Sequence, residues 1–139
     1  MCGIAGIVEF NSLDEKLQSK LEVMGNILAH RGPDDKGIWI HENLNIGFTH
    51  RRLSIIDLST AGKQPMSDNG GNWIIFNGEI YNYKQIALEL NVNQFKSKSD
   101  TEIILLAYRK WGRKCLNKFR GMFAFVIWDE DKKELFCAR

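Results

Sequence analysis

Four short stretches of the sequence place chemically useful side chains beside apolar runs that are typical of strands. They are Cys2 near the N-terminus, HRRLSIID at 50–57, FNGEIYN at 76–82 and SKSDTE at 97–102. Side chains at strand ends are held by a rigid element, so such groups can keep a fixed geometry. Each stretch also has an ordinary structural explanation, which competes with the chemical one.

Cys2 directly follows the initiator methionine and precedes a glycine in MCGIAGIV. On one interpretation Cys2 is a small apolar residue at the start of a first strand, since most cysteines are buried filler. On the other, Met1 is removed, and Cys2 is then both the chain terminus and the nucleophile. Position alone favours the first interpretation.

Asn77 and Gly78 form the Asn-Gly pair of FNGEIYN. Taken alone, this dipeptide predicts a tight hairpin turn, because Asn and Gly accept the backbone angles that such turns require. The alternative is an oxyanion site, in which the Asn77 amide and the Gly78 backbone N–H converge on a developing negative charge. Fixed donors of this kind suit acyl transfer.

Asp100 and the arginine pair Arg51 and Arg52 offer charges of opposite sign. An aspartate in the first turn of a helix stabilises the helix dipole, and arginines at a strand end are commonly solvated. Alternatively, an arginine fork holds a carboxylate in a bidentate pair, and an aspartate holds an ammonium group. Placed together, the two would bind both ends of an α-amino acid.

The composition is that of one soluble globular domain. The chain has 139 residues, 44% hydrophobic and 26% charged, with a net charge of +2. That charge argues against a nucleic-acid or anionic-membrane partner. No apolar run is long enough to cross a membrane, and the N-terminus lacks the pattern of a secretory signal.

The cysteines and histidines do not predict a metal site. Three cysteines without CxxC spacing support neither a disulfide framework nor zinc, and they favour a reducing, cytoplasmic setting. The three histidines show no ligand spacing and are interpreted as structural or surface groups. These residues are Cys2, Cys115 and Cys137, and His30, His41 and His50.

Hydrophobic periodicity predicts an α+β fold. Two capping boxes, Ser12-x-x-Glu15 and Ser99-x-x-Glu102, are each expected to begin a helix. The first helix is expected to end at 30–33, with Gly32 as a left-handed cap. The second is expected to carry an apolar face that extends to Leu116. A short helix is expected at 83–90, and SDNGGN at 67–72 predicts a turn. The predicted strands lie at 2–10, 37–41, 44–50, 73–76, 122–129 and 134–138.

With these residues in view, the sequence resembles the N-terminal glutamine amidotransferase domain of glutamine-hydrolysing asparagine synthetases. This is the class II type, with an N-terminal nucleophile. The resemblance covers essentially all of residues 1–139. Six blocks carry it in order: MCGIAGI, HRGPDDKG, RRLSIIDLSTAGKQPM, FNGEIYNY, SDTEIIL and RGMFAFVIWD.

The resemblance implies a fold and a set of site residues. The fold is a four-layer αββα sandwich of mostly antiparallel sheets of the N-terminal-nucleophile hydrolase type, here C-terminally truncated. Cys2 is the implied nucleophile, and Asn77 and Gly78 are the implied oxyanion hole. The implied glutamine-binding residues are Arg52, Leu53, Ile55, Ile56, Asn77, Gly78, Glu79 and Asp100, and no metal is expected.

The resemblance also implies a reaction and its partners. Glutamine is the expected substrate, hydrolysed through a Cys2 thioester to release ammonia. A C-terminal synthetase domain, which would use ATP and Mg²⁺ to amidate aspartate, is expected as a partner and is absent from residues 1–139. No cofactor is expected within these residues, a homodimer is left open, and weak or absent activity is expected from the isolated chain.

Two other functions stay open at the level of sequence. In the first, the ammonia reaches a different acceptor, such as a sugar or a peptide carboxylate, because related proteins with altered acceptors share this half. In the second, a non-catalytic module retains the fold for oligomerisation or regulation. That alternative predicts loss of Cys2, Asn77 or Asp100, and all three are present.

Overall fold

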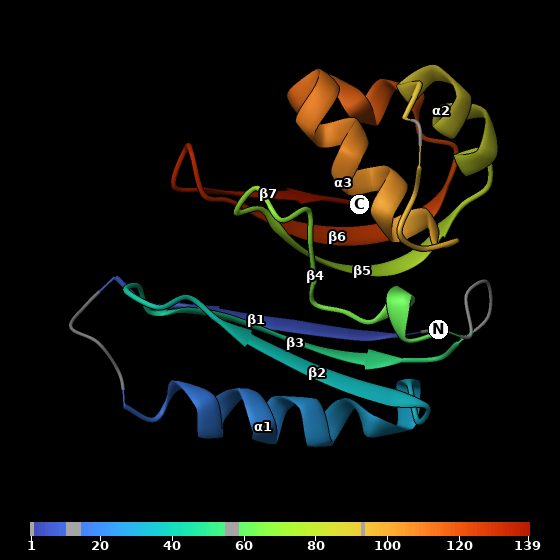
Figure 1. Cartoon of the computed structure of the whole chain (residues 1–139). Helices are drawn as coiled ribbons and strands as arrows, with labels where there is room; N and C mark the ends of the chain where they lie inside the picture. Colours follow the sequence, from blue (N-terminus) through green and yellow to red (C-terminus); the bar gives the residue numbers. More distant parts are fainter. Residues whose placement is uncertain (1, 11–14, 55–58, 93) are drawn as a thin grey trace.

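The computed structural model describes residues 2–10, 15–54, 59–92 and 94–139, which form two antiparallel sheets between helices (Figure 1). The first sheet has the order β1-β3-β2, with β1 at Gly3–Val8, β2 at Asp35–Ile40 and β3 at Ile46–Arg52. Helix α1 (Leu17–Ile27) covers its outer face and continues as the 3₁₀ helix η1 (Leu28–Arg31).

The second sheet has the order β4-β5-β6-β7. Its strands are β4 (Met66–Ser67), β5 (Trp73–Ile80), β6 (Gly121–Asp129) and β7 (Glu134–Ala138). Helices α2 (Tyr83–Leu90) and α3 (Asp100–Trp111) cover the outer face, and the 3₁₀ helix η3 (Gly112–Lys118) follows α3. A further 3₁₀ helix, η2 (Thr60–Gly62), follows β3 and precedes β4 in the sequence. The predicted α+β class is confirmed, and the layers are compatible with a sandwich.

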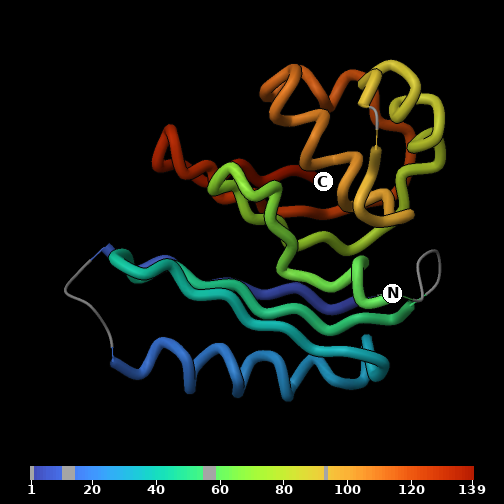
Figure 2. The backbone as a smooth tube through the Cα atoms, viewed as in Figure 1, coloured from blue at the N-terminus to red at the C-terminus, as the bar shows by residue number. Residues whose placement is uncertain are grey.

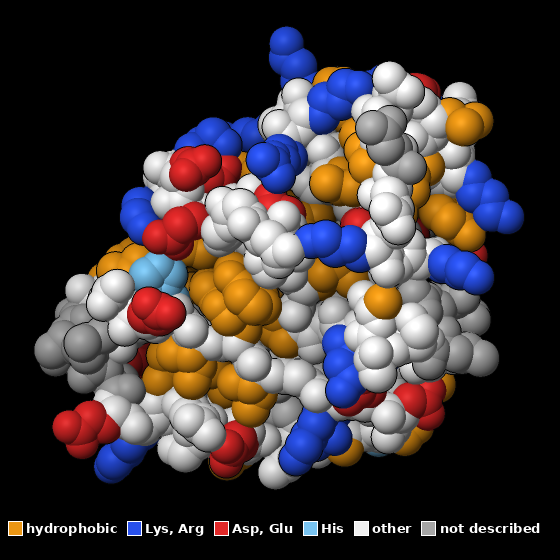
Figure 3. Space-filling model, in the orientation of Figure 1, with side chains coloured by type: hydrophobic (Ala, Val, Ile, Leu, Met, Phe, Trp, Pro, Cys, Tyr) orange, Lys and Arg blue, Asp and Glu red, His pale blue; other side chains and the backbone are white. Residues whose placement is uncertain are grey.

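Alternation along β5 explains how the two sheets share a core. Ile74 and Phe76 belong to the cluster beneath α2 and α3, whereas Ile75 belongs to the cluster between the sheets. Successive side chains of a strand point to opposite faces, so one apolar run supplies both clusters. At the edge of the sandwich Trp39 stacks on Trp73 with ring centroids 5.0 Å apart. Figure 3 shows hydrophobic side chains gathered between the two sheets on this face.

Several predicted boundaries need correction. Helix α1 begins at Leu17 after Lys16, which makes no side-chain cap, and Ser12 lies outside the described residues. Gly32 ends η1 with φ −151°, so it is not a left-handed cap. Helix α3 ends at Trp111 and continues as η3, because the backbone of Gly112 takes a positive φ of 58°.

The predicted capping box at Ser99 is also wrong. The Ser99 side chain makes no cap to the helix, and the Glu102 carboxylate instead accepts from the backbone N–H groups of Lys96 and Ser97. Glu102 therefore orders the loop before α3, in place of closing the helix end on itself. The start of α3 is held in this way at the same end of the molecule as the start of β1 and the end of β5 (Figures 1 and 2).

Candidate active site

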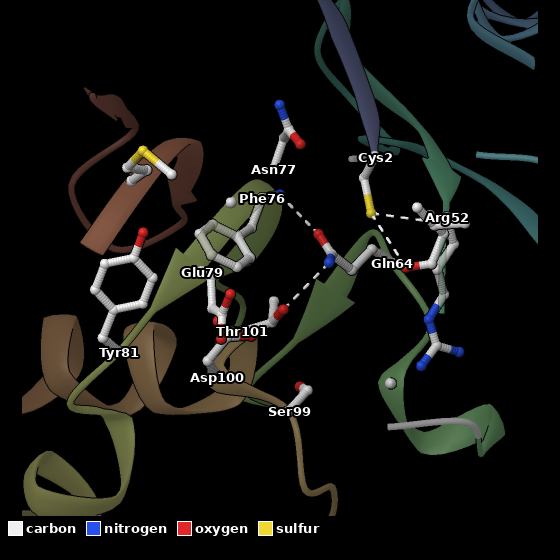
Figure 4. A pocket seen from close by; sticks show the side chains of 14 residues that line it. Cys2, Arg52, Gln64, Phe76, Asn77, Glu79, Tyr81, Ser99, Asp100 and Thr101 are labelled. Atoms are coloured by element: carbon white, nitrogen blue, oxygen red, sulfur yellow. Dashed lines mark hydrogen bonds between the residues drawn. The ribbon is translucent and has the colours of Figure 1, made fainter. Parts of the chain in front are cut away.

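A cavity of about 220 Å³ opens where β1, β3, β5 and α3 meet. Of the predicted site residues, Cys2, Arg52, Leu53, Asn77, Gly78, Glu79 and Asp100 line it. Ile55 and Ile56 lie outside the described residues. The other lining residues are Gly62, Gln64, Phe76, Tyr81, Ser99, Thr101 and Met122 (Figure 4). Stretches far apart in the sequence thus meet around one space suited to a small ligand.

The Cys2 thiol lies against the backbone of Leu53. The Leu53 N–H donates to Cys2 Sγ at 3.4 Å, and the thiol donates to the Leu53 carbonyl oxygen at 3.8 Å. Strand pairing explains this contact, because Gly3 pairs with Arg51 and the residues at the strand ends therefore meet. Arg31 Nε donates to the Cys2 carbonyl oxygen at 3.1 Å.

Asn77 and Gly78 lie inside β5, paired with Ala124 and Phe123 of β6. The hairpin-turn interpretation of Asn-Gly is therefore wrong. Gly78 has φ +151°, and a Cβ there would lie 2.2 Å from the Met122 carbonyl oxygen. Glycine is required by this close approach to β6. Asn77 Oδ1 is buried and has no hydrogen-bond partner among the described residues.

The charged residues of the cavity carry opposite signs. Arg52 is 7% exposed at the end of β3, and its Nη1 donates to the Ser59 carbonyl oxygen at 2.9 Å. Asp100 is 4% exposed at the start of α3, where its Oδ2 accepts the Ile80 N–H at 3.0 Å. Arg51, in contrast, points to α1 and donates to the Gly25 carbonyl oxygen. The prediction that Arg52, not Arg51, faces the cavity is consistent with this geometry.

Burial raises the pKa of the Asp100 carboxyl above its usual range, and the nearby Glu79 charge acts in the same direction. The Ile80 N–H opposes this shift by donating to the carboxylate. The negative charge of an ionised Asp100 is therefore only partly balanced by its neighbours in the described chain. A bound ammonium group would supply the missing positive charge. The carboxylate pair of Asp100 and Glu79 suits a cationic ligand group.

We predict that Asp100→Asn stabilises the fold and removes ligand binding. Because the folded-state pKa is raised, the stability contributed by Asp100 is complete below its unfolded pKa and is lost as pH rises through the folded pKa. The substituted carboxamide does not titrate, and its oxygen can still accept the Ile80 N–H. Urea unfolding at pH 7 is expected to show a more stable variant, and the gain should shrink towards pH 4. A gain of the same size at both pH values would contradict this.

Glu102→Gln is the matched control for Asp100→Asn. Both carboxylates lie in the first turn of α3, but that of Glu102 accepts two backbone N–H groups and the Ser97 hydroxyl. Replacing it weakens charge-assisted hydrogen bonds, at a cost of about 1 kcal/mol or more. The control is therefore expected to lose stability where Asp100→Asn gains it.

Comparison with known proteins identifies the family. A family model described as a glutamine amidotransferase domain matches residues 1–139. The chain belongs to the glutamine amidotransferase family. Asparagine synthetase [glutamine-hydrolyzing] 1 of Bacillus subtilis is 41% identical over 144 residues, and that of Zea mays is 34% identical over 140. Amidase chry2 of Gibberella zeae is 38% identical over 151 residues.

Each of these matches covers 100% of the chain but only 22–23% of the relative. The amidotransferase domain thus corresponds to a minor part of each longer protein. No described helix of the domain is long and apolar enough to span a membrane. The described residues also contain no cluster of three or more His, Cys, Asp or Glu side chains placed to hold a metal.

Sequence reasoning assigned no site role to seven residues that line the amidotransferase cavity, among them Gln64, Tyr81, Thr101 and Met122. Gln64 and Thr101 lie within the motif blocks QPM and SDTE, so the signal was present without an assigned role. Tyr81 and Met122 are 56% and 71% exposed. They lie within the motif blocks FNGEIYNY and RGMFAFVIWD, but their place at the cavity depends on the pairing of β5 with β6.

Proposed function

We propose that this domain hydrolyses glutamine to glutamate and ammonia, with Cys2 as the nucleophile. The observation that supports it best is the convergence of a thiol, an unpaired carboxamide, a buried arginine and a buried carboxylate on one cavity. These groups are those of Cys2, Asn77, Arg52 and Asp100. Membership of the glutamine amidotransferase family supports the substrate.

The substrate is oriented by its two charged groups. The Arg52 guanidinium binds the α-carboxylate of glutamine, and Asp100 and Glu79 bind the α-ammonium group. Leu53 contributes backbone atoms to the same pocket, and the family resemblance assigns glutamine binding to Ile55 and Ile56 as well. Fixing both ends of the amino acid presents its δ-carboxamide to the thiol, which supplies the proximity on which acyl transfer depends.

The reaction begins once Met1 has been removed and Cys2 carries a free α-amine. A free α-amine is a base suited to accept the thiol proton at neutral pH. The thiolate attacks the δ-carbon, and the Gly78 N–H and the Asn77 amide bind the oxyanion. The C–N bond breaks and ammonia leaves with the proton. Water then hydrolyses the thioester to glutamate and restores the thiol.

We further propose that the ammonia serves ATP-dependent amidation of aspartate by a C-terminal synthetase domain, in a cytoplasmic asparagine synthetase. The names and lengths of the relatives support this. ATP and Mg²⁺ belong to that domain and not to residues 1–139. The two-sheet layering supports an N-terminal-nucleophile hydrolase fold. One similar protein is named an amidase and not an asparagine synthetase, so a different acceptor stays as the alternative.

Intact mass of the purified chain tests the proposed function. Exposure to a chloroketone analogue of glutamine is expected to add one adduct at Cys2 of a chain that has lost one methionine, and excess glutamine should block it. Cys137 is exposed and does not line the cavity, so its modification serves as the unprotected control. A retained Met1 with no glutamine-protected adduct would overturn the proposal.

A further inference from the structure

The free edge of β5 carries the atoms that surround the proposed oxyanion. Strand β6 pairs with β5 along its whole length, whereas β4 pairs only with Trp73 and Ile74. Beyond Ile74 the opposite edge of β5 therefore has no strand partner in the described chain. Its backbone groups there must be satisfied by side chains or by a ligand.

Two of these backbone N–H groups are taken by side chains. The Phe76 N–H donates to Gln64 Oε1 at 2.7 Å, and the Ile80 N–H donates to Asp100 Oδ2 at 3.0 Å. In an antiparallel strand, every second residue directs its N–H to the same edge. Gly78 lies midway between these two residues, so its N–H points to the same edge and into the cavity.

Gln64 is held so that its carboxamide faces in one direction. It is 8% exposed, and its Nε2 donates to Thr101 Oγ1 at 3.1 Å, which leaves Oε1 directed to Phe76 (Figure 4). The Phe76 carbonyl oxygen accepts from His50 Nε2 at 3.1 Å. Both polar groups of the Phe76 backbone are thus bound by side chains of other elements, two residues before Gly78.

We propose that Gln64 is a positioning residue for the oxyanion site, oriented by Thr101. Its hydrogen bond to the Phe76 N–H holds the backbone of β5 in place at this edge of the sheet. The direction of the Gly78 N–H, two residues further along the strand, is fixed as a result. The proposal rests on the proposed function, because it gives Gly78 its role. A small displacement of a donor is expected to cost reaction rate, since an oxyanion donor acts only at short range.

The test measures the rate of Cys2 alkylation in the full chain at increasing concentrations of the chloroketone glutamine analogue. The half-saturating concentration and the maximal rate are obtained separately. Gln64→Met keeps the length and loses both hydrogen bonds. We expect its maximal rate of Cys2 alkylation to fall by about 10–100-fold, with half-saturation within about threefold of wild type. Alkylation of Cys2 by iodoacetamide, which develops no oxyanion, should stay within about twofold of the wild-type rate.

Variants of Thr101 show whether its hydrogen bond to Gln64 or the volume of its side chain determines the rate. Thr101→Val removes the acceptor that orients Gln64 and should lower the same maximal rate, whereas Thr101→Ser keeps the hydroxyl and should restore it. Adding Thr101→Val to Gln64→Met should cause no further loss. Tyr108→Phe is the stability control, because it removes a buried 2.8 Å hydrogen bond to Asp129 outside the cavity.

Three results would overturn the inference: an unchanged maximal rate in Gln64→Met, an equal loss of iodoacetamide reactivity, or a matching loss of maximal rate in Tyr108→Phe. The last two would indicate general unfolding. Failure of the proposed function is distinguishable, because wild type would then form no glutamine-protected adduct at Cys2.

Discussion

Introduced into the full-length protein, Cys2→Ala is expected to abolish glutamine hydrolysis while leaving glutamine binding intact. Without the thiol no thioester forms, and loss of a nucleophile typically lowers turnover by about 10⁴-fold or more. The groups proposed to bind the substrate, Arg52 and Asp100, are untouched. Ammonia release measures the loss, and calorimetric titration with glutamine measures the binding that should persist.

Cys137→Ala is the matched control, since that thiol is exposed on β7 and outside the cavity. It should change neither ammonia release nor binding. If Cys2→Ala keeps wild-type turnover, Cys2 is not the nucleophile. If Cys2→Ala loses glutamine binding together with turnover, the substitution has damaged the cavity. The assignment of binding to other residues than Cys2 would then be wrong.

Gly78→Ala is expected to damage both stability and reactivity. The added Cβ would lie 2.2 Å from the Met122 carbonyl oxygen and 2.5 Å from Phe123 Cα, and φ is +151°. Backbone strain and overpacking each cost about 1–3 kcal/mol, so we expect unfolding to become easier by about 3 kcal/mol or more. The displaced N–H should also slow alkylation of Cys2 by the chloroketone analogue by at least about 10²-fold.

Gly112→Ala separates strain from contact. Gly112 also has a positive φ, +58°, but an added Cβ there meets nothing within 4 Å. It should cost about 1–3 kcal/mol from strain alone and leave the reactivity of Cys2 unchanged. Urea unfolding and alkylation kinetics compare the two variants. Wild-type reactivity in a folded Gly78→Ala chain would remove Gly78 from the oxyanion site.

Local pattern predicted most elements of the fold. The helix expected at 83–90 and the strand expected at 134–138 have these bounds in the structure, and the strand expected at 122–129 is one residue longer. Periodicity succeeds there because each element buries one regular face. Helix ends were predicted less well, because the loop before α3 uses Glu102 in a way that a capping motif does not encode.

The Asn-Gly pair shows where local pattern fails. By itself the dipeptide favours a hairpin turn, yet pairing with Ala124 and Phe123 keeps it extended within β5. The partner strand lies more than 40 residues away in the sequence, and its contribution outweighs the local preference. Motif resemblance supplied the alternative of an oxyanion site, and that role remains a proposal for a pair that lies within the strand.

The sequence by itself determined the chemical groups of the site: the thiol of Cys2, the Asn77–Gly78 pair and the charges of Arg52 and Asp100. Only the tertiary structure decided which backbone N–H groups face the cavity and what holds them. Gln64 reaches Phe76 across 12 residues and Thr101 across 37. Such contacts depend on how two sheets and a helix pack, and no local pattern of residue types specifies that distance or direction.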